Sequence, residues 1–366
     1  MRTTSWAVLA AIMTVVGCGA ASPSAAPSAK ERQPGGEVAK PAAPAPRVEV
    51  SLSGYQSVLQ PERRADRLGQ EYMLPSDRTL AYFKAKGVHV FRLPMLWERL
   101  QPQPGKPLDA AKVKELRAYL DHADRLGVRF IADLHAFGRH RDQVLGSPQL
   151  PISALVSFWE QFARAFAGRF EGYDIMNEPH DMPSPAVWPR AAQLTVDAIR
   201  KVDRTTTLYI EGDYWSNAQK WPEVNGALDI RDPAGRLIYS AHQYFDFDSS
   251  GQYHKDYASD GADPEIGGRR VRPFIAWLRS RKARGHLGEF GIPTDDRAWL
   301  PVLDRFLDEA FRGGDVLTGV TYWMAGDWAD NYKLTLQPAK GDRWIDRPQT
   351  AILLKRRPTS PAPAAR

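Results

Sequence analysis

The chain has 366 residues, of which 43% are hydrophobic and 25% are charged, and its formal net charge is +6. This length suits one large domain or two smaller ones, because single hydrophobic cores stop growing beyond about 250–300 residues. The charge balance is basic, but lysines and arginines are scattered. Their densest run, 267–285, is typical of the solvated face of one helix, so we expect no nucleic-acid partner.

The first 18 residues have the proportions of an export signal. Arg2 precedes an apolar stretch from Trp6 to Val16, which is shorter than the roughly 20 residues that span a bilayer. The stretch ends in VVGC, which resembles a bacterial lipobox with Cys18 as the lipidated residue. We therefore expect 1–18 to be a lipoprotein-type signal peptide and the protein to reach the outer membrane or cell surface on an N-terminal lipid anchor. A plain secretory signal, giving a secreted protein, is the alternative.

Low-complexity segments flank one expected folded region. Residues 19–46 are rich in Ala, Pro, Ser and Gly, and they carry too few large apolar side chains to offset the entropy of ordering. We expect them to form a disordered tether, and 356–366 to form a disordered tail. The folded domain is then 47–355. Because Cys18 is the only cysteine, this domain must be stable without disulfides.

Short apolar runs within the folded region predict parallel strands. There are eight of them, at 48–52, 88–94, 128–135, 173–179, 207–213, 237–244, 285–291 and 318–323. Helical patterns separate most of them, at 109–127, 151–169 and 185–203, whereas the connection after 207–213 is only weakly helical. An open doubly wound sheet and a closed (β/α)8 TIM barrel both fit this alternation. The count of eight, and the lack of Gly-x-Gly-x-x-Gly after the first run, favour the barrel.

Polar and aromatic side chains gather where the predicted strands end. They are Arg92, His135, Asn177, Glu178, His242, Tyr244, Glu289 and Trp323. In a barrel these ends open on one face, which carries the active site. Glu178 and Glu289 would face each other across that opening. Two such carboxyl groups are the machinery of glycoside hydrolysis, in which one protonates the departing oxygen and the other acts on the anomeric carbon or activates water.

The ordered set of these residues resembles glycoside hydrolase family 5, the cellulase family of (β/α)8 retaining enzymes. The resemblance rests on FRLP, DLHAFGRH, YDIMNEPH, YSAHQYFD, GHLGEFG and TYWMAGDW, and it covers nearly the whole folded region. It implies that Glu178 is the acid/base and Glu289 the nucleophile of a double displacement. Retention requires the carboxyl groups to lie about 5–5.5 Å apart, against roughly 6.5–9.5 Å for inversion, and we expect the shorter distance.

The other members of the set have expected supporting tasks. Arg92 would keep Glu289 ionised and Tyr244 would donate a hydrogen bond to it. Asn177 would bind the sugar 2-hydroxyl. The histidines, His135 and His242, would orient sugar hydroxyls and hydrogen-bond the carboxyl groups.

The aromatic residues indicate the substrate class, because pyranose rings stack their apolar faces on tryptophan. Trp323 is expected to form the floor beneath the reacting sugar. Four more are expected to line a long groove: Trp97, Trp215, Trp221 and Trp328. The expected substrate is a β-glucan polysaccharide, cut by a monomer at internal β-1,4 bonds without a cofactor. Ala136, where similar endoglucanases tend to carry Asn, leaves β-mannanase, xyloglucanase and licheninase activities as alternatives.

Two rival functions are disfavoured by the sequence. A metal hydrolase could use His135, His140, His242 and Asp133 as ligands, but there is no His-x-His on the first strand and no His-Glu-x-x-His, so we expect no metal. A non-catalytic carbohydrate-binding lipoprotein would not need both glutamates.

Overall fold

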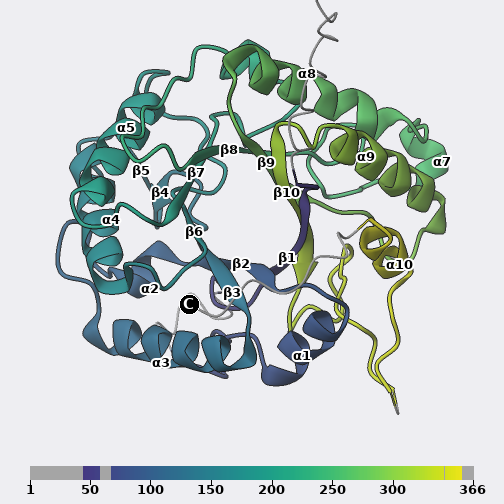
Figure 1. The fold of residues 1–366 in the computed structure, drawn as a ribbon, viewed down its shortest axis with the longest axis horizontal. Coiled ribbons are helices and arrows are strands. Elements are labelled where there is room, and N and C mark those ends of the chain that lie inside the picture. Colours follow the sequence, from purple (N-terminus) through teal and green to yellow (C-terminus); the bar gives the residue numbers. More distant parts are fainter. Residues whose placement is uncertain (1–43, 58–66, 342, 357–366) are drawn as a thin grey trace, which may run out of the picture. The chain divides into compact units, whose positions relative to one another are not determined.

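Eight parallel strands close a barrel in the described part of the chain, with helices around its outside (Figure 1). The computed structural model describes residues 44–57, 67–341 and 343–356. Around the barrel the order is β1-β10-β9-β8-β7-β6-β3-β2. The bounds are β1 Arg47–Leu52, β2 Val90–Met95, β3 Arg129–Leu134, β6 Gly172–Asp174, β7 Thr207–Glu211, β8 Leu237–His242, β9 Gly285–Phe290 and β10 Leu317–Ala325. The predicted TIM barrel is therefore confirmed.

The predictions for the chain ends lie almost entirely outside the described residues. This holds for the signal peptide 1–18 with its lipidation site Cys18, and for most of the tether 19–46 and of the tail 356–366. Among the residues that are described, no helix is long and apolar enough to cross a membrane.

The fourth predicted strand is shorter than expected. β6 ends at Asp174, although the chain beyond it still touches both neighbouring strands. The N–H of Ile175 donates to the carbonyl of Tyr209 at 3.2 Å, and the N–H of Asn177 donates to that of Leu134 at 2.9 Å. At Glu178 the backbone turns into the left-handed region, with φ of 44°. The turn takes the chain out of the barrel wall and directs the Glu178 side chain over the opening of the barrel.

The helices cover the outside of the barrel. Their bounds are α1 Asp77–Ala85, α2 Trp97–Leu100, α3 Ala110–Leu126, α4 Ile152–Phe166, α5 Val187–Arg200, α6 Trp221–Val224, α7 Tyr257–Asp260, α8 Ile266–Arg281, α9 Leu300–Arg312 and α10 Pro348–Leu354, with a 3-10 turn η1 Arg297–Trp299 and a hairpin of β4 Arg139–His140 and β5 Gln143–Val144. α3 begins and ends as predicted, because the Asp109 side chain accepts two N–H groups and Gly127 adopts φ of 69°. The weakly helical connection holds only the single turn α6.

The basic run 267–285 corresponds mostly to α8. Its outer face is solvated as predicted, with Arg272 and Arg279 exposed, and its inner face buries Val271 and Leu278. Arg270 is the exception, because it is buried. Its Nη1 donates to the carbonyls of Tyr244 and Asp246 at 2.8 and 2.7 Å. One basic residue of the run therefore holds the loop that follows β8.

Candidate active site

A cleft of about 620 Å³ opens at the carboxyl ends of the strands. Of the residues predicted for the site, His135, Asn177, Glu178, Trp215, His242, Tyr244, Glu289 and Trp323 line it. Further lining residues include Phe137, His180, Tyr214, Asn217, Tyr332 and the segment 248–252. The barrel topology thus brings together side chains from strands that are far apart in sequence, as expected of this fold.

Arg92 lies beneath the cleft, fully buried, and it organises the acidic groups there. Its Nη1 donates to Glu289 at 2.6 Å, its Nε donates to Asp174 at 3.0 Å, and its Nη2 donates to both Asn177 Oδ1 at 2.8 Å and Glu211 at 3.0 Å. A buried guanidinium is tolerated only when it is paired. Here burial alone would lower the pKa of Arg92, but the surrounding carboxylates raise it well above its usual value.

Glu289 is held in one orientation by two donors. It is the fifth residue of β9 and is almost fully buried. Arg92 donates to its Oε1 at 2.6 Å, and the Tyr244 hydroxyl donates to its Oε2 at 2.9 Å. The hydrogen bond from the guanidinium is charge-assisted, and together the two donors fix both oxygens of the carboxyl group. Burial and the charge of Glu289 in turn raise the pKa of Tyr244 well above its usual value, so that its hydroxyl stays a donor.

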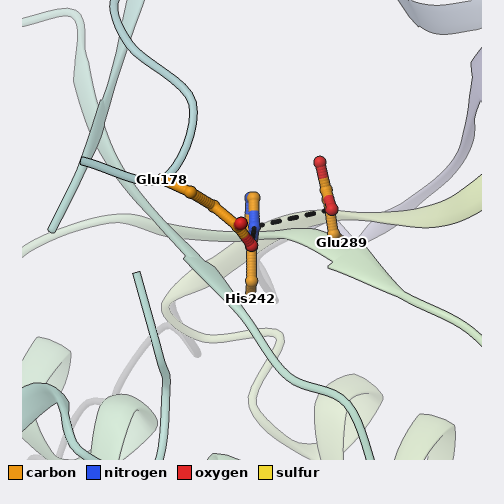
Figure 2. A group of neighbouring side chains, drawn as sticks. All are labelled: Glu178, His242 and Glu289. Atoms are coloured by element: carbon orange, nitrogen blue, oxygen red, sulfur yellow. Dashed lines mark hydrogen bonds and ion pairs between the residues drawn. The ribbon is translucent and has the colours of Figure 1, made fainter. Parts of the chain in front are cut away.

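Glu178 has a different setting, although it lies near Glu289. Figure 2 shows the two glutamates on either side of His242. The Oε1 of Glu178 lies 2.7 Å from His242 Nδ1, and no arginine or lysine pairs with Glu178 among the described residues. Burial, with a smaller contribution from Glu289 and Glu211, raises the pKa of Glu178 above 4.5 despite the opposing effect of His242. The two carboxyl groups therefore have different partners, an arginine and a tyrosine for Glu289 and a histidine for Glu178.

His242 connects the acidic groups. Its Nδ1 is 3.7 Å from Glu289 Oε2, and its Nε2 is 3.0 Å from Glu211 Oε1. Burial would lower its pKa, but the charges of Glu211 and Glu289 raise it well above 6.5. One oxygen of each cleft glutamate and a ring nitrogen of His242 all lie within 4.8 Å of one another, an arrangement that can also hold a divalent cation. Such an ion would have to displace the imidazole proton and approach Arg92, so the cluster suits a shared proton better.

Aromatic rings form two parallel stacks in the cleft. Trp323 stacks on His135 with ring centroids 5.0 Å apart and planes 4° apart, and its Nε1 donates to the Tyr332 hydroxyl at 3.1 Å. Trp215 stacks on His180 at 4.4 Å and 16°. Both tryptophans line the cleft, and Trp215 is 41% exposed.

Three of the predicted groove tryptophans do not line the cleft. Trp97 is fully buried, where its Nε1 donates to Gln101 and its ring packs on Phe158. Trp221 is also fully buried, against Phe274 of α8. Those two predictions are wrong, because each tryptophan begins a single helical turn that places its ring in the core and not in the cleft. Trp328 is exposed but lies outside the set that lines the cleft.

The proposed metal ligands are not gathered at one point. His140 is buried, and its Nε2 is 2.8 Å from the Gln101 carbonyl oxygen. Asp133 instead lies 3.0 Å from Arg92, and its Oδ2 is 2.8 Å from His135 Nδ1, which orients that imidazole. His135 and His242 therefore have carboxylate partners of their own.

Sequence reasoning missed three residues of the site. Glu211 ends β7, Asp174 ends β6, and Tyr332 follows β10 at the rim of the cleft. For Glu211 the signal was present, since a carboxylate near the end of an apolar run is the pattern that singled out Glu178, whereas Asp174 lay at the start of the predicted run 173–179 and ends a strand only because β6 is shorter than expected. Tyr332 lies in an irregular loop and gave no such signal.

Known proteins that resemble this chain in sequence and structure lead to the same conclusion. Residues 45–323 match the cellulase family, glycosyl hydrolase family 5. The Pseudomonas stutzeri endoglucanase Cel5A, solved with cellobiose, is 38% identical, with a TM-score of 0.77 over 84% of this chain and 91% of that one. An endo-β-1,4-glucanase from Xanthomonas axonopodis pv. citri is 33% identical, with a TM-score of 0.77 over 85% and 98%.

A curated relative, the probable endo-β-1,4-glucanase B of Neosartorya fischeri, is 29% identical over 281 residues, which are 76% of this chain and 82% of that protein. Fold, site geometry and family match agree, and the chain belongs to glycosyl hydrolase family 5, the cellulase family.

Proposed function

We propose that this protein is a retaining endo-β-1,4-glucanase in which Glu178 is the acid/base and Glu289 the nucleophile. The observation that carries the proposal is the pair itself. Two glutamates share one cleft, with oxygens within 4.8 Å of each other, yet only Glu289 is paired with an arginine, whereas Glu178 contacts His242. This spacing supports retention, because inverting enzymes hold their carboxyl groups roughly 6.5–9.5 Å apart to admit a water molecule.

In the first step Glu289, oriented by Arg92 and Tyr244, attacks the anomeric carbon. The bond from that carbon to the glycosidic oxygen breaks, its electron pair goes to the oxygen, and protonated Glu178 donates its proton there. In the second step Glu178, now a carboxylate, takes a proton from water. The oxygen of that water attacks the anomeric carbon and releases Glu289. Asn177 supports the sugar 2-hydroxyl, since its buried Nδ2 has no protein partner among the described residues and the residue lines the cleft.

A neutral β-glucan is the substrate that the cleft suits. No lysine or arginine is among the described residues that line it, which argues against a polymer of uronic acids. Trp323 and Trp215 offer ring faces for pyranose stacking. The relatives are endoglucanases, and a structure of another similar protein, 32% identical, contains cellopentaose. The retaining step, the residue roles and action on β-1,4-glucan together form the proposal.

Export on a lipid attached to Cys18, and a monomeric state, belong to the same proposal. The support for the lipid anchor is the VVGC motif at the end of the apolar stretch. Replacing Cys18 with Ser should move activity from the membrane fraction to the soluble fraction, and size-exclusion chromatography of the mature domain should give the mass of one chain.

The decisive experiment compares Glu178→Gln and Glu289→Gln on two substrates, cellopentaose and an aryl cellobioside whose leaving group departs without a proton. Loss of Glu289 should abolish turnover of both. Loss of Glu178 should abolish turnover of cellopentaose but leave a rapid first release of the aryl group. Glu223→Gln, at an exposed residue of α6, is the control and should match the wild type.

The products identify the reaction and the substrate. Proton NMR of the first product should show the β anomer. An α anomer would contradict retention, and activity on mannan without activity on the glucans would replace the substrate. Wild-type protein that binds glucan without cleaving it would instead indicate a carbohydrate-binding protein.

A further inference from the structure

Glu211 is a fully buried acid in the site that does not line the cleft. Its Oε2 accepts the backbone N–H of Glu178 at 2.7 Å. Its Oε1 lies 3.0 Å from Arg92 Nη2 and 3.0 Å from His242 Nε2. The Glu211 carboxylate therefore contacts three groups. They are the main chain of Glu178, the imidazole of His242, which contacts the side chain of Glu178, and Arg92, which contacts Glu289.

The contact with the main chain matters because the backbone of Glu178 is strained. Its φ of 44° lies in the left-handed region, which is unfavourable for a residue with a side chain. Such a conformation persists only when its surroundings hold it. The bond to Glu211 fixes the N–H of Glu178, and with it the direction in which the side chain leaves the loop.

The contact of Glu211 with His242 affects the carboxyl end of the Glu178 side chain. Glu211 lies within ion-pair distance of Nε2, at 3.0 Å, on one side of the ring, and the ring presents Nδ1 to Glu178 at 2.7 Å on the other. Other charged or titratable groups face this cluster from the surrounding elements: Arg92 on β2, Asp133 on β3, Asp174 on β6, Tyr244 after β8 and Glu289 on β9. Of these acids, Glu211 alone contacts both the backbone of Glu178 and its histidine.

We propose that Glu211 is a positioning residue for acid catalysis: it holds the strained backbone of Glu178 and, through His242, keeps the proton of the Glu178–His242 pair available at the cleft. This inference rests on the proposed role of Glu178. Two substitutions separate geometry from charge. Glu211→Gln keeps the size of the side chain and removes its charge, and Glu211→Asp keeps the charge and shortens the reach.

The first readout is the pH dependence of kcat/KM on cellopentaose. The interacting pair of Glu178 and His242 titrates as a unit, so the alkaline limb reports the loss of its proton. A negative charge beside the pair raises its pKa, and removing that charge lets the proton leave at lower pH. In Glu211→Gln the alkaline limb should move toward acid by about one pH unit or more. In Glu211→Asp the limb should stay, while kcat falls about 10- to 100-fold through misplacement of Glu178.

The second readout is the dependence on the leaving group. Both variants should lose far more of the rate on cellopentaose than of the rapid first release of the aryl group, because only the first step on cellopentaose needs a proton from Glu178. A merely structural role would lower both rates equally and leave the limb in place, and that result would overturn the inference.

Thermal unfolding verifies that each variant is folded. If Glu211→Gln does not fold, Glu211→Asp decides, and a wild-type kcat in that variant would also overturn the inference. Wild-type protein that cleaves no glycan would overturn the proposed function and this inference together.

Discussion

At the scale of the residue, Arg92 balances the negative charges of the site. Four carboxylates and one amide oxygen converge on a single guanidinium that is closed off from solvent. Lysine carries the same charge but only one nitrogen, so it cannot occupy these directions at once. The identity of the residue, and not its charge alone, holds Glu289 and Asn177 in register.

We expect Arg92→Lys to lower kcat at least 100-fold and to lower the free energy of unfolding by about 3–5 kcal/mol, because buried acids lose their partner. Steady-state kinetics and urea unfolding measure the two effects. Arg279→Lys is the matched control, since Arg279 forms an exposed ion pair with Asp315 that contributes less than about 1 kcal/mol. Equal effects of the two substitutions would contradict this account of the site.

The placement of individual residues could be predicted from the sequence in some cases and not in others. Glu178, Glu289 and Arg92 were predictable because barrel topology sends every strand end to one face, whatever the distance in sequence. Trp97 and Trp221 were not, because a tryptophan just past a strand end has the same sequence pattern whether it faces the cleft or the core. The first turn of the connecting segment decides which side the tryptophan faces. The contacts that fix this turn are made with residues distant in sequence, so the neighbouring sequence does not reveal them.

At the scale of the element, the loop after β8 connects the surroundings of Glu289 to the helical layer. The Asp246 carboxylate accepts the N–H groups of Gly251 and Tyr253, at 3.1 and 3.0 Å, and Arg270 of α8 binds the Asp246 carbonyl. Gly251 has φ of 73°, and a Cβ there would lie 2.9 Å from the Tyr244 ring. The loop therefore packs directly on the side chain that donates to Glu289.

We expect Gly251→Ala to lower kcat about 10-fold or more, because the added methyl group displaces the Tyr244 ring and lengthens its bond to Glu289. Kinetics on cellopentaose and thermal unfolding test this. Gly261→Ala is the control, since Gly261 has a similar φ of 80° but open space around it. It should lose about 1 kcal/mol of stability through backbone strain and keep its kcat. A variant at 251 that behaves like the one at 261 would mean that the loop does not position Tyr244.

At the scale of the whole molecule, the barrel interior holds a second polar layer nearer the amino ends of the strands. Glu49 of β1 is fully buried, and its Oε2 accepts from Thr321 at 2.9 Å and lies 3.0 Å from His286 Nε2. The other ring nitrogen of His286 lies 3.0 Å from Ser240. Arg47 Nε donates to Glu49 from the edge of the barrel. Alternation along the strands predicts only that such residues face inward, so sequence could not show that they satisfy one another.

This layer makes the stability of the protein depend on pH. Burial alone would raise the pKa of Glu49, but Arg47 and the hydrogen bonds from His286 and Thr321 lower it from 4.5 to about 2. A carboxyl group with a lowered pKa contributes stability above its unfolded value, and this contribution is lost as the pH falls from about 4.5 to about 2. Burial lowers the pKa of His286, so its contribution is likewise lost as the pH falls below 6.5. Both groups therefore favour unfolding in acid.

We expect Glu49→Gln to lower the free energy of unfolding by about 3 kcal/mol at pH 7, which corresponds to the shift in the pKa of Glu49, and by much less near pH 3. Urea unfolding at pH 7, 5 and 3 measures this dependence. Glu223→Gln, at an exposed residue, should change the free energy by less than about 0.5 kcal/mol throughout. A constant loss at every pH would mean that Glu49 matters through packing alone. A loss that shrinks toward acid would show that its charge stabilises the barrel below the catalytic layer.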